Sequence, residues 1–164
     1  MSRQRFPITA AGYEKLKTEL KQFKSVERPN VIQAIAEARA HGDLSENAEY
    51  DAAKEHQGFV EAHILELENA LAIAEVVDPV TISSDAVAFG ATVEVEDSDS
   101  VDLIIYQIVG DMESDPVHGR IAVSSPVARA LLGKMVGDEA VVQLPDGKRY
   151  LEIREIRYEE IALI

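Results

Sequence analysis

Apolar residues recur at helical spacing over residues 9–41. They lie three or four residues apart, which places them on one face of a helix. These positions are Tyr13, Leu16, Leu20, Phe23, Val31, Ile35 and Ala38. Thr9 is a suitable N-cap and Gly42 is a natural stop for this helix. Pro29 interrupts the pattern, and because it has no backbone N–H we expect a kink there.

A second helix is predicted over residues 44–77, again with a narrow apolar face. Its apolar positions are Val60, Ile64, Leu67, Leu71 and Ala74, and the register extends back through Gln57, Ala53 and Tyr50 to Glu46. Two helices of about 33 residues, each about 50 Å long, joined by a tight turn must lie antiparallel and bury their faces against each other. Residues 1–78 therefore predict an antiparallel coiled-coil hairpin with its tip at residues 42–47.

In the second half of the chain, apolar and polar residues alternate, which is the pattern of β-strands. Residues 79–86 are predicted to be a linker, and residues 87–164 a small, mostly antiparallel α+β domain. Ser125 as N-cap and Pro126 at the first helical position start one short helix, and residues 145–148 form a hairpin turn. The expected strands are Ala91–Glu96, Leu103–Val109, Arg120–Val123, Ala140–Leu144 and Arg149–Ile156.

Composition and charge narrow the class of protein. The chain has no cysteine, so it has no disulfide framework. It has no secretion signal and no apolar run of about 18 residues, so we expect a cytoplasmic protein without a membrane partner. A net charge of −14 disfavours autonomous binding to nucleic acid. Residues 1–42 nevertheless carry a net positive charge, and the residues from Asp43 onward carry a net negative charge.

Two features of the hairpin have plain structural interpretations. The basic first helix faces an acidic second helix, which predicts interhelical ion pairs for Lys17, Lys21 and Lys24. The histidines at positions 41, 56, 63 and 118 lack metal-ligand spacing. His56 and His63 fit flank positions of a coiled coil better than a zinc site.

The acidic tip has a structural and a chemical interpretation. Asp43 is a good N-cap for the second helix, and Glu46 then completes a capping box. Capping does not explain Leu44, an apolar residue at the most exposed point of the hairpin. The two carboxylates also suit one shared Mg²⁺ whose other ligands come from a partner. A second metal held in this way activates water for phosphodiester hydrolysis.

Several longer segments carry a resemblance to a known family. These are AIAEARAHGDLSENAEYDAAKEHQGF at 34–59, FGATV at 89–93, YQIVGD at 106–111 and SPVARALLGK at 125–134. In order and spacing they resemble the GreA/GreB family of bacterial transcript-cleavage elongation factors, over nearly the whole chain. Three positions depart from the family's usual residues: Ser45 replaces a frequent lysine, Lys54 an arginine, and Ser124 an aspartate or asparagine.

The resemblance implies a fold and a partner. It implies that the C-terminal domain is similar to FK506-binding proteins (FKBP-like) and docks on bacterial RNA polymerase, at the rim of its secondary channel, through Ser124, Ser125 and Pro126. The coiled coil then enters the channel. The protein itself is expected to be a monomer and not an enzyme.

The resemblance also implies roles for individual residues. Asp43 and Glu46 would hold a second Mg²⁺ jointly with the polymerase, which then cuts the 3′ end of backtracked RNA. Leu44, Ser45 and Asn47 would contact the active centre, while Arg39 and Lys54 steer the RNA. Two alternatives remain at this point: a channel-binding regulator that does not stimulate cleavage, and a folding helper with a prolyl-isomerase-like domain.

Overall fold

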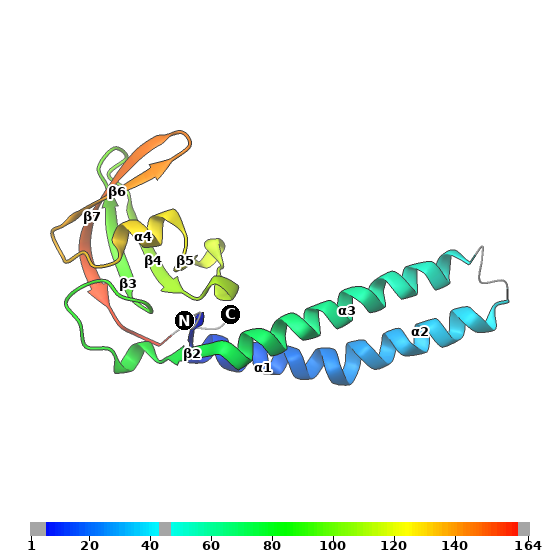
Figure 1. The fold of residues 1–164 in the computed structure, drawn as a ribbon. Helices are drawn as coiled ribbons and strands as arrows, with labels where there is room; N and C mark the ends of the chain where they lie inside the picture. The colour runs from blue at the N-terminus through cyan, green and yellow to red at the C-terminus, as the bar shows by residue number, and fades with distance from the viewer. Residues whose placement is uncertain (1–5, 43–46, 161–164) are drawn as a thin grey trace, which may run out of the picture. The chain divides into compact units, whose positions relative to one another are not determined.

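The structure is a computed structural model that describes residues 6–42 and 47–160. The chain divides into two compact units (Figure 1). The first, which we call the arm, comprises Glu14–Ile73. The second, the globular unit, comprises Met1–Tyr13 together with Ala74–Ile164.

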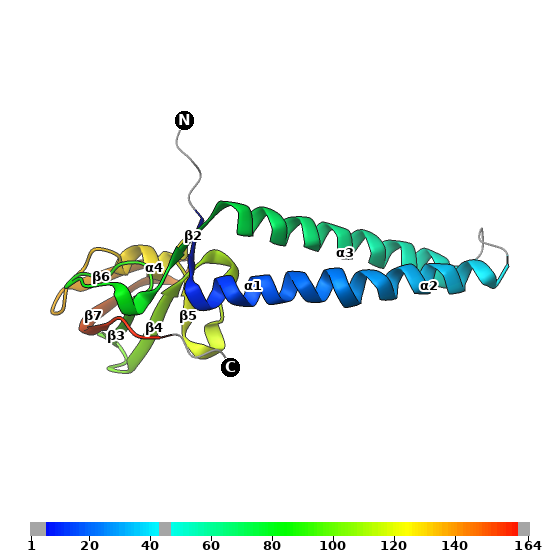
Figure 2. The same ribbon diagram turned by 90° about the horizontal axis from the view of Figure 1, so that it is seen from below.

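The arm is the helical hairpin that the apolar spacing predicts. Helix α1 (Ala10–Gln22), a π-helical turn (Phe23–Glu27) and helix α2 (Arg28–Ala40) run along helix α3 (Ala48–Ile73), as Figure 2 shows from below. Its core is a single row of side chains, because each helix offers only a narrow apolar face. The buried residues of this row are Leu16, Val31, Ile35, Ala38, Val60, Ile64, Leu67 and Ala70.

The π-helical turn lies where a kink was predicted, just before Pro29. Arg28 N–H bonds to the carbonyl of Phe23, five residues back, while Pro29 itself has no N–H to donate. The turn also absorbs a change in the apolar spacing, because Phe23 and Val31 are eight residues apart where a regular heptad has seven. The widened turn allows both segments to face α3.

Helix α3 is shorter than predicted at both ends. It begins at Ala48 and not near residue 44, and it ends at Ile73 because Ala74–Val77 form strand β2. Strand β2 pairs in parallel with strand β1 (Phe6–Thr9). The β-branched Val76 and Val77 favour this extended conformation once a partner strand is present. The predicted hairpin range 1–78 thus includes two strands that belong to the globular unit.

The globular unit is built on a five-stranded sheet in the order β5-β4-β3-β7-β6. The strands are β3 (Thr92–Asp97), β4 (Leu103–Val109), β5 (Arg120–Ala122), β6 (Glu139–Leu144) and β7 (Gly147–Arg157). All neighbours are antiparallel except β4 and β5. Helix α4 (Pro126–Leu131) packs on one face, where Ala128 and Leu131 join the core. The predicted α+β class is confirmed. So are the strands predicted from alternation and the short helix predicted from Ser125 and Pro126.

Short helical turns connect these elements. Pro79–Thr81 forms a 3₁₀ turn in the predicted linker, and Asp111–Glu113 forms another between β4 and β5. A third lies at Pro116–His118. No helix within 6–42 or 47–160 is both long enough and apolar enough to cross a membrane.

Candidate functional site

The acidic tip lies at the end of the arm where α2 stops and α3 starts. Four predicted site residues, Asp43, Leu44, Ser45 and Glu46, lie outside the described residues. The residues on either side of them are described. Gly42 has φ of +107°, the left-handed backbone expected of a glycine that closes a helix.

Asn47 makes the contacts that close the hairpin. Its side-chain amide donates to the carbonyl of Ala38 (2.7 Å), and its side-chain oxygen accepts from Tyr50 N–H (3.2 Å). The predicted cap, Asp43, lies outside the described residues, and the N-cap of α3 is Asn47. The physical reason is that an amide both donates and accepts, whereas a carboxylate only accepts. The predicted capping box of Asp43 with Glu46 likewise lies outside the described residues.

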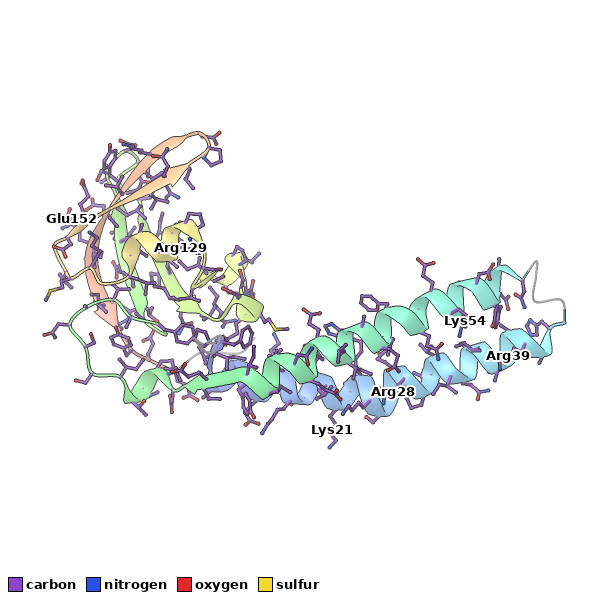
Figure 3. The ribbon with its side chains drawn as sticks, viewed as in Figure 1. Lys21, Arg28, Arg39, Lys54, Arg129 and Glu152 are labelled. Atoms are coloured by element: carbon purple, nitrogen blue, oxygen red, sulfur yellow. The ribbon has the colours of Figure 1, made fainter. Side chains whose placement is uncertain are left out.

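Arg39 and Lys54, the predicted RNA-steering residues, lie near this same end of the arm on facing helices (Figure 3). Both line one groove of about 250 Å³, together with Ile32, Ile35, Ala36 and Gln57. The Arg39 guanidinium lies 5.9 Å from the centre of the Tyr50 ring, within the range of a cation–π contact. Lys54 Nζ donates to Gln57 (3.1 Å).

The two cations of this groove are not paired with carboxylates of the described residues. Within the described part of the arm, neither Arg39 nor Lys54 forms an ion pair. The nearby pair of His41 with Glu49 (3.3 Å) involves neither of them. Two cations above partly apolar walls form a surface that suits a phosphate-bearing ligand.

Ion pairs between exposed side chains connect the flanks of the two helices. Lys24 pairs with Glu68 at 2.5 Å, and Arg28 makes two bonds to Glu61, at 2.8 and 2.9 Å. The hydrogen bond from Arg28 lowers the pKa of the Glu61 carboxyl. The predicted interhelical pairing is confirmed for Lys24. Lys17 pairs with Glu14 of its own helix, and Lys21 forms no ion pair with any described residue.

His63 occupies the flank position that the spacing predicts. Its Nε2 lies 2.7 Å from Glu19, and its ring lies between those of Phe23 (4.5 Å between centroids) and Phe59 (6.1 Å). The hydrogen bond with Glu19 raises the pKa of this imidazole. No group of three metal-ligating side chains occurs in the regions that the structure describes.

The predicted docking residues lie together at the start of α4. Ser125 accepts from Ala128 N–H (3.3 Å) as the N-cap, and Pro126 follows at the first helical position. Ser124 donates both its hydroxyl (2.7 Å) and its N–H (3.3 Å) to one carboxylate oxygen of Asp111. Asp111 was not predicted as a site residue, although the segment 106–111 that contains it carried part of the resemblance.

Comparison with known proteins places these features in a class. A family model described as "Transcription elongation factor, N-terminal" matches residues 6–76, and one described as "Transcription elongation factor, GreA/GreB, C-term" matches residues 82–158. The class that they define is that of transcription elongation factors. The chain belongs to the GreA/GreB family.

Two sequence relatives agree with this assignment. The chain is 56% identical to transcription elongation factor GreA of Ralstonia nicotianae, over 93% of this chain and 97% of the relative. It is 55% identical to GreA of Neisseria meningitidis serogroup B, over 94% and 99%. A solved structure, GreA factor homolog 1 (Gfh1) of Thermus thermophilus, is 28% identical over 94% of this chain and 99% of that chain, with a TM-score of 0.44.

Proposed function

We propose that this protein binds bacterial RNA polymerase and stimulates the polymerase's own cleavage of backtracked RNA. Family membership supports a role in transcription elongation. The observation that carries the finer proposal is at the tip. Asn47 caps α3 and closes the hairpin, so the start of α3 does not depend on the carboxylates of Asp43 and Glu46.

The chemistry follows from the ligand preferences of magnesium. Mg²⁺ keeps several waters and accepts one or two protein carboxylates together with phosphate oxygens. Asp43 and Glu46 would contribute those carboxylates, and the polymerase and the RNA would contribute the rest. Magnesium held in this way generates a nucleophilic water and stabilises the leaving oxygen. The protein is then a cofactor of the polymerase and not an enzyme, and it holds no Mg²⁺ of its own.

The arm explains how the carboxylates reach a buried active centre. Helix α3 has 26 residues, which gives a length of about 39 Å at 1.5 Å per residue. The hairpin would enter the secondary channel, where Leu44, Ser45 and Asn47 contact the active centre. The groove with Arg39 and Lys54 would hold the extruded 3′ segment of RNA by its phosphates.

Docking is assigned to the globular unit. Ser124, Ser125 and Pro126 would contact the rim of the channel. The net charge of −14 means that protein–protein contacts must supply most of the affinity. A cytoplasmic location and a monomeric state complete the proposal.

The test is cleavage of labelled RNA in a backtracked polymerase complex. We expect rapid release of short 3′ fragments with wild-type protein and Mg²⁺, and none with Asp43→Asn combined with Glu46→Gln. Asp51→Asn, which changes an exposed carboxylate of the first turn of α3, is the matched control and should cleave like wild type.

The outcomes separate the competing functions. Equal cleavage by the double variant would disprove the metal-ligand role. Tight polymerase binding without cleavage by the wild type would favour the channel-binding regulator. Catalysis of prolyl isomerisation in a peptide, with no polymerase binding, would favour the folding helper.

A further inference from the structure

The short turn between β4 and β5 touches two distant parts of the globular unit. We call residues 110–113 the coupling turn. Asp111 accepts two hydrogen bonds from Ser124, one of the residues assigned to docking. Glu113, at the end of the turn, contacts Thr9, which lies 104 residues away in sequence and starts the helix that leads into the arm.

Glu113 makes three hydrogen bonds. Its carboxylate accepts from Thr9 N–H (3.0 Å), from the Thr9 hydroxyl and from Gly110 N–H (2.7 Å). Thr9 is fully buried, and its hydroxyl accepts in turn from Gly12 N–H (3.1 Å) as the N-cap of α1. One carboxylate therefore binds the residue that caps α1.

Capping of the coupling turn alone does not explain these contacts. It accounts for the bond from Gly110 but not for the two bonds from Thr9. The packing is also closer than a cap requires. A Cβ at Gly12 would lie 1.9 Å from Glu113 Oε1, and a Cβ at Gly110 would lie 2.6 Å from the carbonyl oxygen of Pro7. A glycine inside a helix is unfavourable, so its presence at position 12 reflects this contact.

The coupling turn thus contacts both a residue assigned to docking and the first turn of α1. We propose that the coupling turn connects docking of the globular unit to delivery of the tip, with Glu113 as a positioning residue for the first turn of α1. The helix runs from that turn to Gln22 and on through the π-helical turn into α2. Glu113 touches neither RNA nor metal in this proposal. The inference rests on the function proposed above for its effect on cleavage, but its structural part does not.

The structural part is tested by the distance between two spin labels. The chain has no cysteine, so Ala52→Cys in the arm and Lys148→Cys in the globular unit give two unique labelling sites, both exposed. We expect a narrow distance distribution in the parent chain. Glu113→Ala removes the acceptor, and Gly12→Ala displaces it, so both should broaden the distribution measurably.

Two control variants keep the test specific. Glu113→Gln retains an oxygen for the two N–H donors and an amide that donates to the Thr9 hydroxyl oxygen, so its distribution should stay narrow. Gly58→Ala makes the same substitution in α3 where nothing lies within 4 Å of the added Cβ, so it should also stay narrow. Circular dichroism of each variant verifies that it is folded.

The functional part is tested by titrating the variants against backtracked polymerase. For Gly12→Ala and Glu113→Ala we expect a maximal cleavage rate at least about tenfold lower, since displacement of a catalytic group by about 1 Å can cost about 100-fold. The concentration for half-maximal cleavage should not change, because Ser124–Pro126 are untouched. Glu113→Gln and Gly58→Ala should match wild type.

Two results would overturn the proposal. The first is a distance distribution as narrow in Gly12→Ala and Glu113→Ala as in the parent chain. The second is a loss of polymerase binding equal to the loss of cleavage, which would mean that Glu113 serves docking alone. If wild-type protein fails to stimulate cleavage, the proposed function fails, and the spin-label distances still decide whether the coupling turn orients α1.

Discussion

At the residue scale, the side chain of Asn47 both caps α3 and closes the hairpin. It donates across the hairpin to Ala38 and accepts within α3 from Tyr50. A carboxylate at this position would satisfy only the second bond and would repel the carbonyl. Because this amide meets both needs, the acidic residues before it are not required for the start of α3.

Replacement of Asn47 separates its two contacts. Asn47→Asp should keep the cap and lose the bond to Ala38, whereas Asn47→Ala should lose both. We expect Asn47→Ala to destabilise the arm by about 1–3 kcal/mol, from a lost cap and an unpaired carbonyl, and Asn47→Asp to lie between it and wild type. Thermal unfolding followed by circular dichroism measures this order, and equal stability of all three proteins would contradict it.

His63 makes the stability of the arm depend on pH. Its pKa is raised, chiefly by the hydrogen bond to Glu19 and further by Glu66. Protonated His63 therefore favours the folded arm, so this contribution is complete below the ordinary value of 6.5 and is lost as pH rises through the raised pKa. The unfolding temperature of the arm should fall over that window.

The matched variant for this prediction is His63→Gln. It cannot be protonated, so the fall as pH rises above 6.5 should be smaller than in wild type. Glu19→Gln should reduce the fall as well, since Glu19 is the main cause of the raised pKa. An identical pH profile in wild type and in His63→Gln would show that other groups are responsible.

At the scale of elements, the arm depends on a thin core. A single row of side chains separates the two helices, and its centre is formed by Val31, Ile35, Val60 and Ile64. Surface ion pairs such as that of Arg28 with Glu61 contribute little by comparison, because water screens them. Each buried apolar residue is thus a large fraction of the stability of the arm.

Truncation within this row should unfold the arm selectively. Ile64, which is 2% exposed, contrasts with its neighbour Leu65, which is 58% exposed. Ile64→Ala should cost about 2–5 kcal/mol through the cavity it creates, and Leu65→Ala less than about 0.5 kcal/mol. Helical circular dichroism on heating measures both. Similar losses for the two variants would mean that the arm is packed differently.

At the scale of the whole molecule, the globular unit is formed from two segments that the arm separates in sequence. The globular unit contains the segments that precede and follow the arm in sequence, since β1 pairs with β2 and Thr9 bonds to Glu113. Ile8 in β1 is fully buried. The N-terminal segment is therefore part of the fold of the C-terminal half.

Two shortened chains test this organisation. One joins residues 1–13 to 74–164 through a Gly/Ser linker, and the other begins at residue 79. Burial of Ile8 alone is worth about 1.5–3 kcal/mol, and each kcal/mol shifts the unfolding temperature of such a domain by about 4–8 °C. The chain that begins at residue 79 should therefore unfold at least about 6 °C lower. Equal unfolding temperatures would show that β1 and β2 contribute nothing.

The sequence by itself determined the elements whose cause is local. Apolar residues three or four apart specify the arm, alternation specifies β3 to β7, and Ser125 before Pro126 starts α4, because period and capping act within a few residues. Tertiary structure decided whatever depends on a partner far along the chain. Ala74–Val77 became a strand because β1 lies beside it, Asn47 took the cap because Ala38 offers a carbonyl, and Glu113 met Thr9 only through folding. The chemistry of a residue can be inferred from its type and spacing, but the contacts that close the hairpin at Asn47, or tie Glu113 to α1, exist only in three dimensions.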